Sequence, residues 1–240
     1  IGMIFSAVLV CKTETQTIIV NPRTAKNSNQ SLGICDKIVP GMIIGALSHG
    51  HLPMIFVPAG PMSSGISNLR KATVRNEFAQ RKVGRDKLLE VESQASHGVG
   101  TCTFYGTANS NQMLMEIMGL QIPNSSFVHP SSDARRFFNR EAVKRILAIS
   151  RKNKNSLPIG KLLDERSFVN AIVGLHATGG STNHLLHIPA MAAAAGIKIV
   201  WEDFEQLSKL VPLIARIYPN GSADVNDFHN AGGMGFILQE

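Results

Sequence analysis

Alternating stretches of apolar and polar positions along the chain predict helices joined to short strands. Short apolar runs with β-branched residues are typical of buried strands, and they occupy Met3–Val10, Thr17–Val20, Met54–Val57 and Ile197–Trp201. Apolar positions that recur every three or four residues predict helices. These helices are expected over Asn68–Arg81, Asp86–His97, Thr107–Leu120, Ser132–Arg151, Glu165–His176, Ser181–Ala195 and Asp203–Leu210.

Polar and glycine-rich segments separate these elements. Residues 21–31 are turn-rich and predict a loop, and residues 219–221 (PNG) predict a turn. Helices joined to short apolar strands by glycine-rich turns favour an α/β fold, with a layered, mostly parallel sheet and helices on both faces. Because such sheets bind ligands in the loops beyond the strand ends, we expect the unusual residues to lie there.

Composition excludes several classes of protein. The 240 residues are 44% hydrophobic and 17% charged, which is typical of a globular chain and not of a disordered one. No apolar run approaches the roughly 20 residues that a bilayer span needs, so no membrane segment is expected. Three cysteines are too few, and an odd number, for a disulfide scaffold. They indicate a reducing compartment, where thiols serve as ligands or lie buried.

The net charge of +7 raises the question of nucleic acid. Basic residues are densest over residues 135–154, where apolar residues recur at helical spacing. This pattern predicts an amphipathic helix with a solvated basic face. No zinc-finger, RNA-recognition or helix-turn-helix pattern accompanies it, so no nucleic-acid partner is expected. An anionic small substrate remains compatible with the charge.

Two cysteines lie in segments framed by glycine. Residues 33–41 (GICDKIVPG) place Cys35, Asp36 and Lys37 in succession, and in a tight loop these ligand-type groups can converge. Residues 98–109 (GVGTCTFYGTAN) place Cys102 just before a predicted helix, whose N-terminus favours a thiolate. Each can hold a corner of an iron–sulfur cluster, whose ligands need not be close in sequence. Alternatively, each is a buried structural cysteine. Cys11 has no such setting.

Two further segments are rich in small and hydroxyl residues. Residues 177–184 (ATGGSTNH) combine a glycine turn, hydroxyls and a helix start, which together can bind a phosphate or carboxylate. A capped helix after a turn is the alternative. His184 and His187 lack a third ligand for zinc. Residues 56–65 (FVPAGPMSSG) are typical of a strand end that brings a tight loop to a ligand, or of a simple turn.

These motifs resemble the dihydroxy-acid dehydratase/phosphogluconate dehydratase family. The resemblance rests on residues 35–41, 100–109 and 177–184 and runs from about Leu32 to Gly233. The TFYGTAN form after Cys102, with FVHP at 127–130 and YPNG at 218–221, is similar to the phosphogluconate branch. Residues 1–31 are expected to be an unmatched, non-native segment, and 32–240 a partial N-terminal domain without its C-terminal domain.

The resemblance implies roles for the matching residues. Cys35 and Cys102 would bind a 4Fe-4S iron–sulfur cluster. Asp36 and Lys37 would bind Mg²⁺, the lysine as a catalytic carbamate whose oxygens suit a hard cation. Ser181, Thr182, Asn183 and His184 are candidates for binding a substrate oxyanion. The family's further cysteine ligand, its upstream acidic ligand and its serine base have no counterpart in the chain.

The implied activity is that of a hydro-lyase of the Entner-Doudoroff pathway. It would convert 6-phospho-D-gluconate to 2-keto-3-deoxy-6-phosphogluconate, with an iron site as Lewis acid. Dehydration of another sugar acid or a dihydroxy acid, and an inactive fragment, are the alternatives. The resemblance also implies a small-molecule substrate, a cytoplasmic location and a homodimer of the full-length protein.

Overall fold

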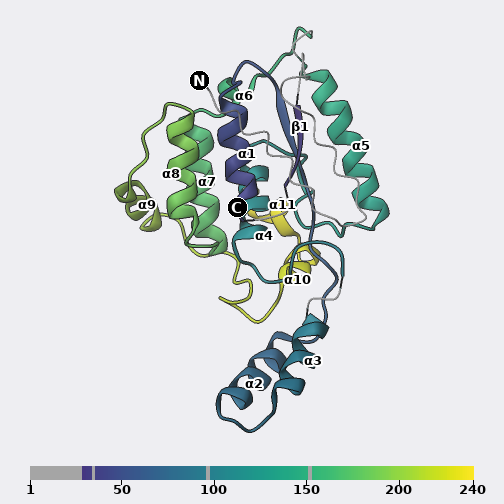
Figure 1. Cartoon of the computed structure of the whole chain (residues 1–240). Coiled ribbons are helices and arrows are strands. Elements are labelled where there is room, and N and C mark those ends of the chain that lie inside the picture. The colour runs from purple at the N-terminus through teal and green to yellow at the C-terminus, as the bar shows by residue number, and fades with distance from the viewer. Residues whose placement is uncertain (1–28, 34–35, 96–97, 151–152) are drawn as a thin grey trace, which may run out of the picture.

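The computed structural model describes residues 29–33, 36–95, 98–150 and 153–240 (Figure 1). The strands expected over Met3–Val10 and Thr17–Val20 lie outside these residues, as do Cys11 and Cys35. The elements in chain order are β1 (Asn29–Gly33), α1 (Ile38–Leu47), β2 (Met54–Pro58), α2 (Asn68–Ala79), α3 (Arg85–Ala95), α4 (Thr107–Ile117), α5 (Asp133–Ala148), α6 (Ile159–Leu162), α7 (Glu165–Thr178), α8 (His184–Ala194), α9 (Trp201–Ser208), α10 (Val225–Asn230) and α11 (Gly233–Ile237).

The two strands pair in parallel. Asn29 lies opposite Met54 and Gly33 opposite Pro58, and all five residues of β2 are buried. Helices α1 and α5 contact the strand pair and lie on opposite sides of it in Figure 1. A mixed α/β arrangement is therefore present, but the described part of the chain contains only these two strands and an isolated parallel bridge between Pro61 and Thr101. It does not show the layered sheet that we expected.

Two expectations from the hydrophobic pattern are wrong. Residues 197–200 form no strand, and α9 begins at Trp201. Ile197 and Ile199 pack against the main core, so the alternating pattern reflects an extended segment that covers the core without a partner strand. Asn29–Ser31, which we expected in a loop, belong to β1. Pairing with β2 supplies their hydrogen bonds, and such tertiary pairing is invisible in local composition.

All seven expected helices are present, and the expected strand at Met54–Val57 and the turn at 219–221 are confirmed. Helix α1 was not predicted, because Pro40 and Gly41 suggested a loop. Pro40 lies in the first turn of α1, where a proline leaves no helical hydrogen bond unmade. The short helices α6, α10 and α11 were also not predicted, since four to six residues give no readable period.

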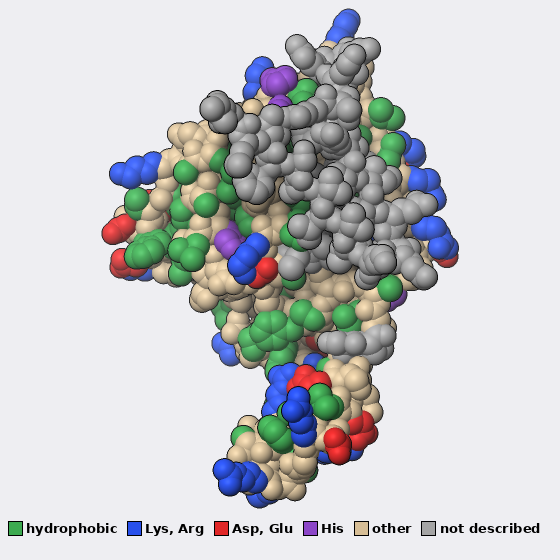
Figure 2. All heavy atoms as spheres, in the orientation of Figure 1, with side chains coloured by type: hydrophobic (Ala, Val, Ile, Leu, Met, Phe, Trp, Pro, Cys, Tyr) green, Lys and Arg blue, Asp and Glu red, His purple; other side chains and the backbone are tan. Residues whose placement is uncertain are grey.

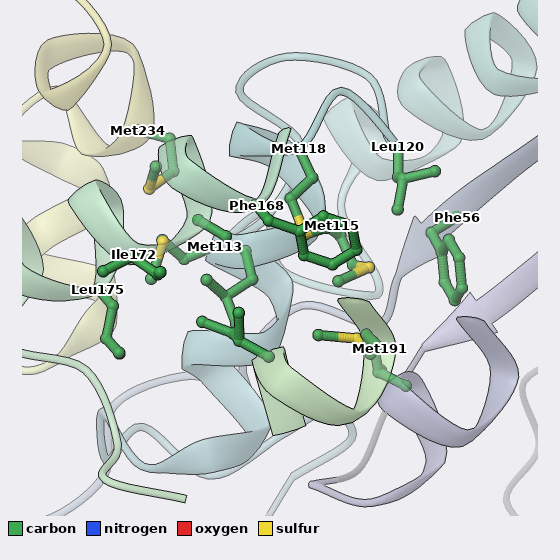
Figure 3. Close-up of a cluster of buried hydrophobic side chains, with 14 of the residues drawn as sticks. Phe56, Met113, Met115, Met118, Leu120, Phe168, Ile172, Leu175, Met191 and Met234 are labelled. Carbon is green, nitrogen blue, oxygen red and sulfur yellow. The ribbon is translucent and has the colours of Figure 1, made fainter. Parts of the chain in front are cut away.

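The main core forms around α4 and α7. Residues 109–116 of α4 are all buried, and Figure 3 shows its methionines against Phe168, Ile172 and Leu175 of α7. Met191 of α8 and Met234 of α11 approach the same cluster. Methionine fills irregular gaps between helices of different direction. Because α4 is enclosed on every side, polar side chains at its N-terminal end must find partners inside the protein.

Helices α2 and α3 form a hairpin that extends away from the other elements in Figure 1. Val74 and Val91 are the buried residues of these two helices. Arg75 joins them through two hydrogen bonds to Glu92, at 2.6 and 2.8 Å. Figure 2 shows basic and acidic side chains side by side on this hairpin. None of the helices in the described ranges is long and apolar enough to cross a membrane.

Candidate functional site

Three of the sequence motifs meet at the N-terminal end of α4. The side-chain amide of Asn111 donates a hydrogen bond of 2.7 Å to the carbonyl of Asp36, just before α1. The hydroxyls of Thr107 and Ser181 lie 2.7 Å apart, and Asn183 Nδ2 donates to Thr107 Oγ1 at 2.9 Å. Segments more than 70 residues apart in sequence are thereby joined. The starts of α1, α4 and α8 form one polar region, which is the candidate site.

Asp36 and Lys37 lie immediately before α1. Lys37 Nζ donates to Asp36 Oδ2 at 2.8 Å, and the side chain of Lys37 is 78% exposed while that of Asp36 is 32% exposed. An ion pair this open to water contributes little stability. Both groups are accessible from solvent. Cys35, which directly precedes them, lies outside the described residues.

Cys102 lies on a segment that we call the Cys102 loop, residues 100–106. Burial alternates along it: Thr101, Thr103 and Tyr105 are buried, whereas Cys102 and Phe104 are exposed. The backbone of the loop makes a hydrogen bond on each side of Cys102: Thr101 N donates to Gly60 O at 2.9 Å, and Tyr105 N donates to Tyr218 O at 2.9 Å. The loop therefore presents a thiol to solvent from a fixed backbone. Cys102 is not the buried structural cysteine of our alternative interpretation.

The segment 58–65, which we call the proline loop, supports the Cys102 loop. Gly60 has a φ of +80°, and a Cβ there would lie 1.9 Å from the Val128 carbonyl oxygen. Gly100 has a φ of +117°, and a Cβ there would lie 2.7 Å from Gly60 O. Only glycine permits both the left-handed backbone and this close approach. Ser64 Oγ donates to Asp224 Oδ2 at 2.6 Å, which ties the same loop to the start of α10.

The residues at the start of α8 differ in exposure. Thr182 and Asn183 are exposed, Ser181 is half-buried and His184 is buried. Several donors that we expected to be free for an anion have partners inside the protein: Ser181 N bonds to Ser110 Oγ, and Asn183 N to Ser181 Oγ. The expected cradle is therefore largely closed by the protein's own hydroxyls, and the side chains of Thr182 and Asn183 remain at its surface.

Two histidines of α8 face this region. His184 Nε2 lies 2.7 Å from Ser110 Oγ, and burial lowers the pKa of His184 to about 3, with a smaller contribution from His187. The pKa of His187 is also lowered, mainly by burial, while Asp36 raises it and Lys37 lowers it. Burial therefore favours the neutral form of both imidazoles. Helices α1 and α8 contact each other, so Asp36 and Lys37 at the start of α1 act on the pKa of His187.

Metal-ligating groups are sparse in the described part of the chain. No three His, Cys, Asp or Glu side chains within it are grouped so that they could hold a metal ion. Cys102 fits one thiolate corner of an iron–sulfur cluster, because its sulfur is exposed on a fixed loop. Asp36 offers a carboxylate oxygen, which suits a hard cation such as Mg²⁺. The described residues thus fit part of a donor set, and Cys35 would extend it.

The polar run at residues 107–112 of α4 is the part of the site that sequence reasoning missed. Its partners belong to four separate segments of the chain, a convergence that only the structure reveals. The available signal was an uninterrupted run of four polar residues, Asn109 to Gln112, directly before the apolar residues 113–115 of the same helix. Polar residues on an enclosed helix are expected to hold neighbouring segments, since each needs an internal partner.

Comparison with known protein families gives one match that covers nearly the whole chain. The model described as "Dihydroxy-acid/6-phosphogluconate dehydratase N-terminal" matches residues 19–240. The matched range includes all the motifs of the candidate site. It begins before Leu32, where the recognisable motifs begin.

Curated relatives agree with this match. The chain is 62% identical to the phosphogluconate dehydratase of Rhizobium meliloti over 209 residues, which are 87% of this chain and 34% of that protein. It is 54% identical to the phosphogluconate dehydratase of Escherichia coli K12, covering 35% of that protein. The dihydroxy-acid dehydratase of Prochlorococcus marinus is 35% identical over 215 residues, 38% of its length. The chain spans about a third of the length of these relatives.

Proposed function

This chain belongs to the dihydroxy-acid/6-phosphogluconate dehydratase N-terminal family, and we propose that it forms part of an enzyme that removes water from 6-phospho-D-gluconate. The observation that carries the proposal is the difference in identity between the two branches. The phosphogluconate dehydratases of Rhizobium meliloti and Escherichia coli K12 are 62% and 54% identical to the chain, whereas the dihydroxy-acid dehydratase of Prochlorococcus marinus is 35% identical. The product would be 2-keto-3-deoxy-6-phosphogluconate.

Cys35 and Cys102 are our candidates for binding a 4Fe-4S cluster, with further ligands outside the residues described. Such a cluster supplies, when bound, a Lewis acid for a hydroxyl that is otherwise a poor leaving group. The exposed sulfur of Cys102 supports the proposal, as does the backbone that fixes its loop. Hydrogen bonds from Asn109 to the carbonyls of Cys102 and Phe104 hold the backbone of the Cys102 loop against the start of α4.

Asp36 and Lys37 are our candidates for binding Mg²⁺. The amine of Lys37 can add to carbon dioxide, forming an N–C bond and releasing a proton, and the resulting carbamate offers oxygen donors to a hard cation. The exposure of Lys37 supports this reaction, because carbon dioxide reaches the amine from solvent. Its 2.8 Å bond to Asp36 places the two prospective ligands on one side of the start of α1.

Residues 181–184 are our candidates for holding a substrate oxyanion. The exposed side chains of Thr182 and Asn183 can donate hydrogen bonds to it, and the N-terminus of α8 favours negative charge. Ser181 and His184 would support the start of α8 without touching the oxyanion, since their side chains already bond to Thr107 and Ser110 of α4. The neutral imidazole of His184 keeps the hydroxyl of Ser110 in place.

The test of the cluster assignment is serine substitution at each cysteine in the natural protein that carries this chain. Cys35→Ser and Cys102→Ser should each abolish iron binding after anaerobic purification. Cys11→Ser is the matched control and should retain iron, with the visible absorbance of a cluster. Equal iron content in the three variants would contradict the assignment of the cysteines.

A second candidate is dehydration of a different sugar acid or of a dihydroxy acid, favoured by the 35% identity to a dihydroxy-acid dehydratase. Assaying the natural protein on 6-phosphogluconate, on unphosphorylated sugar acids and on a dihydroxy acid separates these activities. A preference of at least tenfold for a substrate without phosphate would overturn our choice. The homodimer and the cytoplasmic location implied by the resemblance stay predictions.

A further inference from the structure

One and a half turns of α4 bond to every candidate motif. The polar run of residues 107–112, which we call the α4 polar run, makes these contacts: Thr107 with Ser181, Asn109 with the Cys102 loop, Ser110 with His184, Asn111 with the Asp36 carbonyl, and Gln112 with Gly60 of the proline loop. Within this run, Asn109 is the residue that bonds to the backbone of Cys102, the candidate cluster ligand in the described part of the chain.

Asn109 uses every hydrogen-bonding position of its side chain. Its Nδ2 donates to the carbonyls of Cys102 at 2.6 Å and of Phe104 at 2.7 Å. Its Oδ1 accepts from Thr101 Oγ1 at 2.7 Å and from Gln112 Nε2 at 3.0 Å. A primary amide offers two N–H donors and two acceptor lone pairs. The side chain is fully buried, so water does not compete for any of the four bonds.

These bonds determine where the Cys102 side chain points. The two carbonyls that Asn109 holds belong to Cys102 and Phe104, the residues of the loop whose side chains are exposed. Burial alternates from Thr101 to Tyr105, so a backbone held at Cys102 and Phe104 keeps the Cys102 side chain on the exposed side. The Cys102 sulfur itself lies 3.9 Å from the Phe104 carbonyl oxygen, one of the two that Asn109 holds. No other protein side chain combines this size with two donors and two acceptors on one planar group.

We propose that Asn109 is a positioning residue that holds the Cys102 thiol in the orientation in which it binds the iron–sulfur cluster. The inference rests on the proposed ligand role of Cys102. It assigns a function to a buried side chain that bonds to the backbone of Cys102. The supports on its other side, Thr101 and Gln112, keep the amide from rotating.

The other end of α4 provides a matched control. There Glu116 accepts hydrogen bonds from the backbone amides of Asn124 at 2.5 Å and Ser126 at 3.1 Å, and Ser126 Oγ bonds to Gln112 O at 3.0 Å. This buried network also holds a loop against α4, but that loop carries no candidate ligand. Ser126→Ala therefore removes buried hydrogen bonds without touching the backbone of Cys102.

The first experiment measures thiol reactivity in the folded protein that naturally carries this chain. Asn109→Asp keeps the shape of the side chain and loses both donations to the Cys102 loop. Alkylation by iodoacetamide, quantified on the peptide that contains Cys102, should become several-fold faster in this variant, because the released loop samples more conformations. The rate in Ser126→Ala should match that of the natural protein. Thr101→Val, which removes one support of the amide, should give a smaller change in the same direction.

The second experiment measures how firmly iron is held. Removing a group that orients a metal ligand commonly lowers metal affinity by about 10- to 100-fold. Iron in anaerobically reconstituted Asn109→Asp should therefore be lost to a ferrous chelator faster by that order, with an altered electron paramagnetic resonance spectrum. Ser126→Ala should keep both the rate and the spectrum of the natural protein, even where its thermal stability falls.

The outcomes separate the inference from the proposed function. Thiol and iron behaviour in Asn109→Asp and Thr101→Val that match Ser126→Ala would overturn the positioning role. If Asn109→Asp does not fold, Thr101→Val decides on the same two measurements. Absence of iron from the natural protein would instead contradict the cluster, and the alkylation rates would still show whether Asn109 orients the thiol.

Discussion

Lys37 is the residue of the site whose proposed chemistry depends on one atom. In the natural sequence, Lys37 Nζ donates a hydrogen bond to Asp36 at 2.8 Å. Lys37→Arg keeps the positive charge, and its guanidinium can donate to Asp36 in place of Nζ, but a guanidinium does not form the carbamate. We expect this variant to lose bound Mg²⁺ and at least about 10- to 100-fold of dehydratase activity. Activity and Mg²⁺ content of the natural protein that carries the chain are the measurements.

Lys87 provides the control for this substitution. It makes an ion pair with Glu90 of the same length, 2.8 Å, on an exposed face of α3. Lys87→Arg should leave both activity and Mg²⁺ content unchanged. Full activity in Lys37→Arg would show that the carbamate is not used.

His184 links the site to the pH dependence of stability. Its pKa in the folded protein is lowered to about 3 by burial, with a contribution from His187, whereas an unfolded chain binds a proton near pH 6.5. Between these values the unfolded state carries the extra proton, so stability is complete above pH 6.5 and falls as the pH drops below it. Through His184 alone, the free energy of unfolding should fall by about 2 kcal/mol between pH 7 and pH 5.

Urea unfolding at pH 7, 6 and 5 tests this effect. His184→Gln should be less stable than the natural sequence at pH 7, because it loses its fit to Ser110. Between pH 7 and pH 5, the free energy of unfolding of His184→Gln should fall by about 2 kcal/mol less than that of the natural sequence. His51, which is exposed, is the control, and His51→Gln should keep the natural pH dependence. Parallel pH profiles for all three proteins would rule out the buried neutral state of His184.

The sequence singled out candidate residues of the site but not the residues that bond to them. Gly-framed settings singled out Cys102, and the structure shows its sulfur exposed on a fixed loop. Asn109 escaped notice because its importance comes from four hydrogen bonds to segments that fold next to it. His184 was expected to face a ligand but is buried against Ser110. Contacts of this kind depend on packing, which neither motif nor spacing encodes.

At the scale of elements, the proline loop packs so closely against residues 127–130 that Gly60 has no room for a side chain. Gly60→Ala would place a Cβ 1.9 Å from Val128 O at a φ of +80°. The neighbouring atom is backbone and does not move aside easily, so we expect a loss of about 3 kcal/mol or more in stability. The displaced loop would also move Thr101, and the alkylation rate of Cys102 should rise with it.

Gly45 in α1 is the matched control for Gly60. A Cβ there would meet no atom within 4 Å, and alanine favours a helix over glycine by about 1 kcal/mol. Gly45→Ala should therefore stabilise the protein slightly. Urea midpoints of the two variants measure the difference. A Gly60→Ala variant as stable as Gly45→Ala would show that the proline loop does not pack as described.

Prediction of helices and strands succeeded for long segments with a clear hydrophobic period. It failed where contacts with neighbouring segments determine the local structure. The eleven residues of α4 and the fourteen of α7 carry a readable helical pattern. Ile197 and Ile199 alternate with exposed residues as a strand would, but they cover the helical core instead of pairing. For α1, the glycines and the proline suggested a loop, and burial of Val39 and Ile43 outweighed that local preference.

At the scale of the whole molecule, α4 is where the fold and the site coincide. Its buried methionines join α7 and α8 in the main core, and its N-terminal polar run bonds to the motifs that carry the candidate chemistry. The enclosure of this helix turns polar side chains into obligatory contacts. A sequence shows that such residues are polar. The sequence does not show that α4 is enclosed, and it is this enclosure that makes its polar residues part of the site.

The 240-residue chain by itself is expected to have no dehydratase activity. It spans about a third of relatives such as the Rhizobium meliloti enzyme, covering 34% of that protein. Within the described ranges no three potential ligands are grouped to hold a metal ion, and loss of a proton-transfer group alone costs about 10²- to 10⁴-fold in rate. Exposed apolar side chains such as Trp201 at 68% and Leu210 at 78% should also promote aggregation.

Expression of residues 1–240 without oxygen, with iron and sulfide supplied, allows a direct assay on 6-phosphogluconate. The full-length Rhizobium meliloti phosphogluconate dehydratase, 62% identical over the shared region, is the positive control under the same conditions. We expect the chain to show no turnover above a Cys102→Ser version of itself, because the described residues group no three potential metal ligands and the chain spans about a third of its relatives. Turnover within tenfold of the control would show that these residues alone bind the metal and move the proton, and the catalytic groups would then have to be sought within this chain.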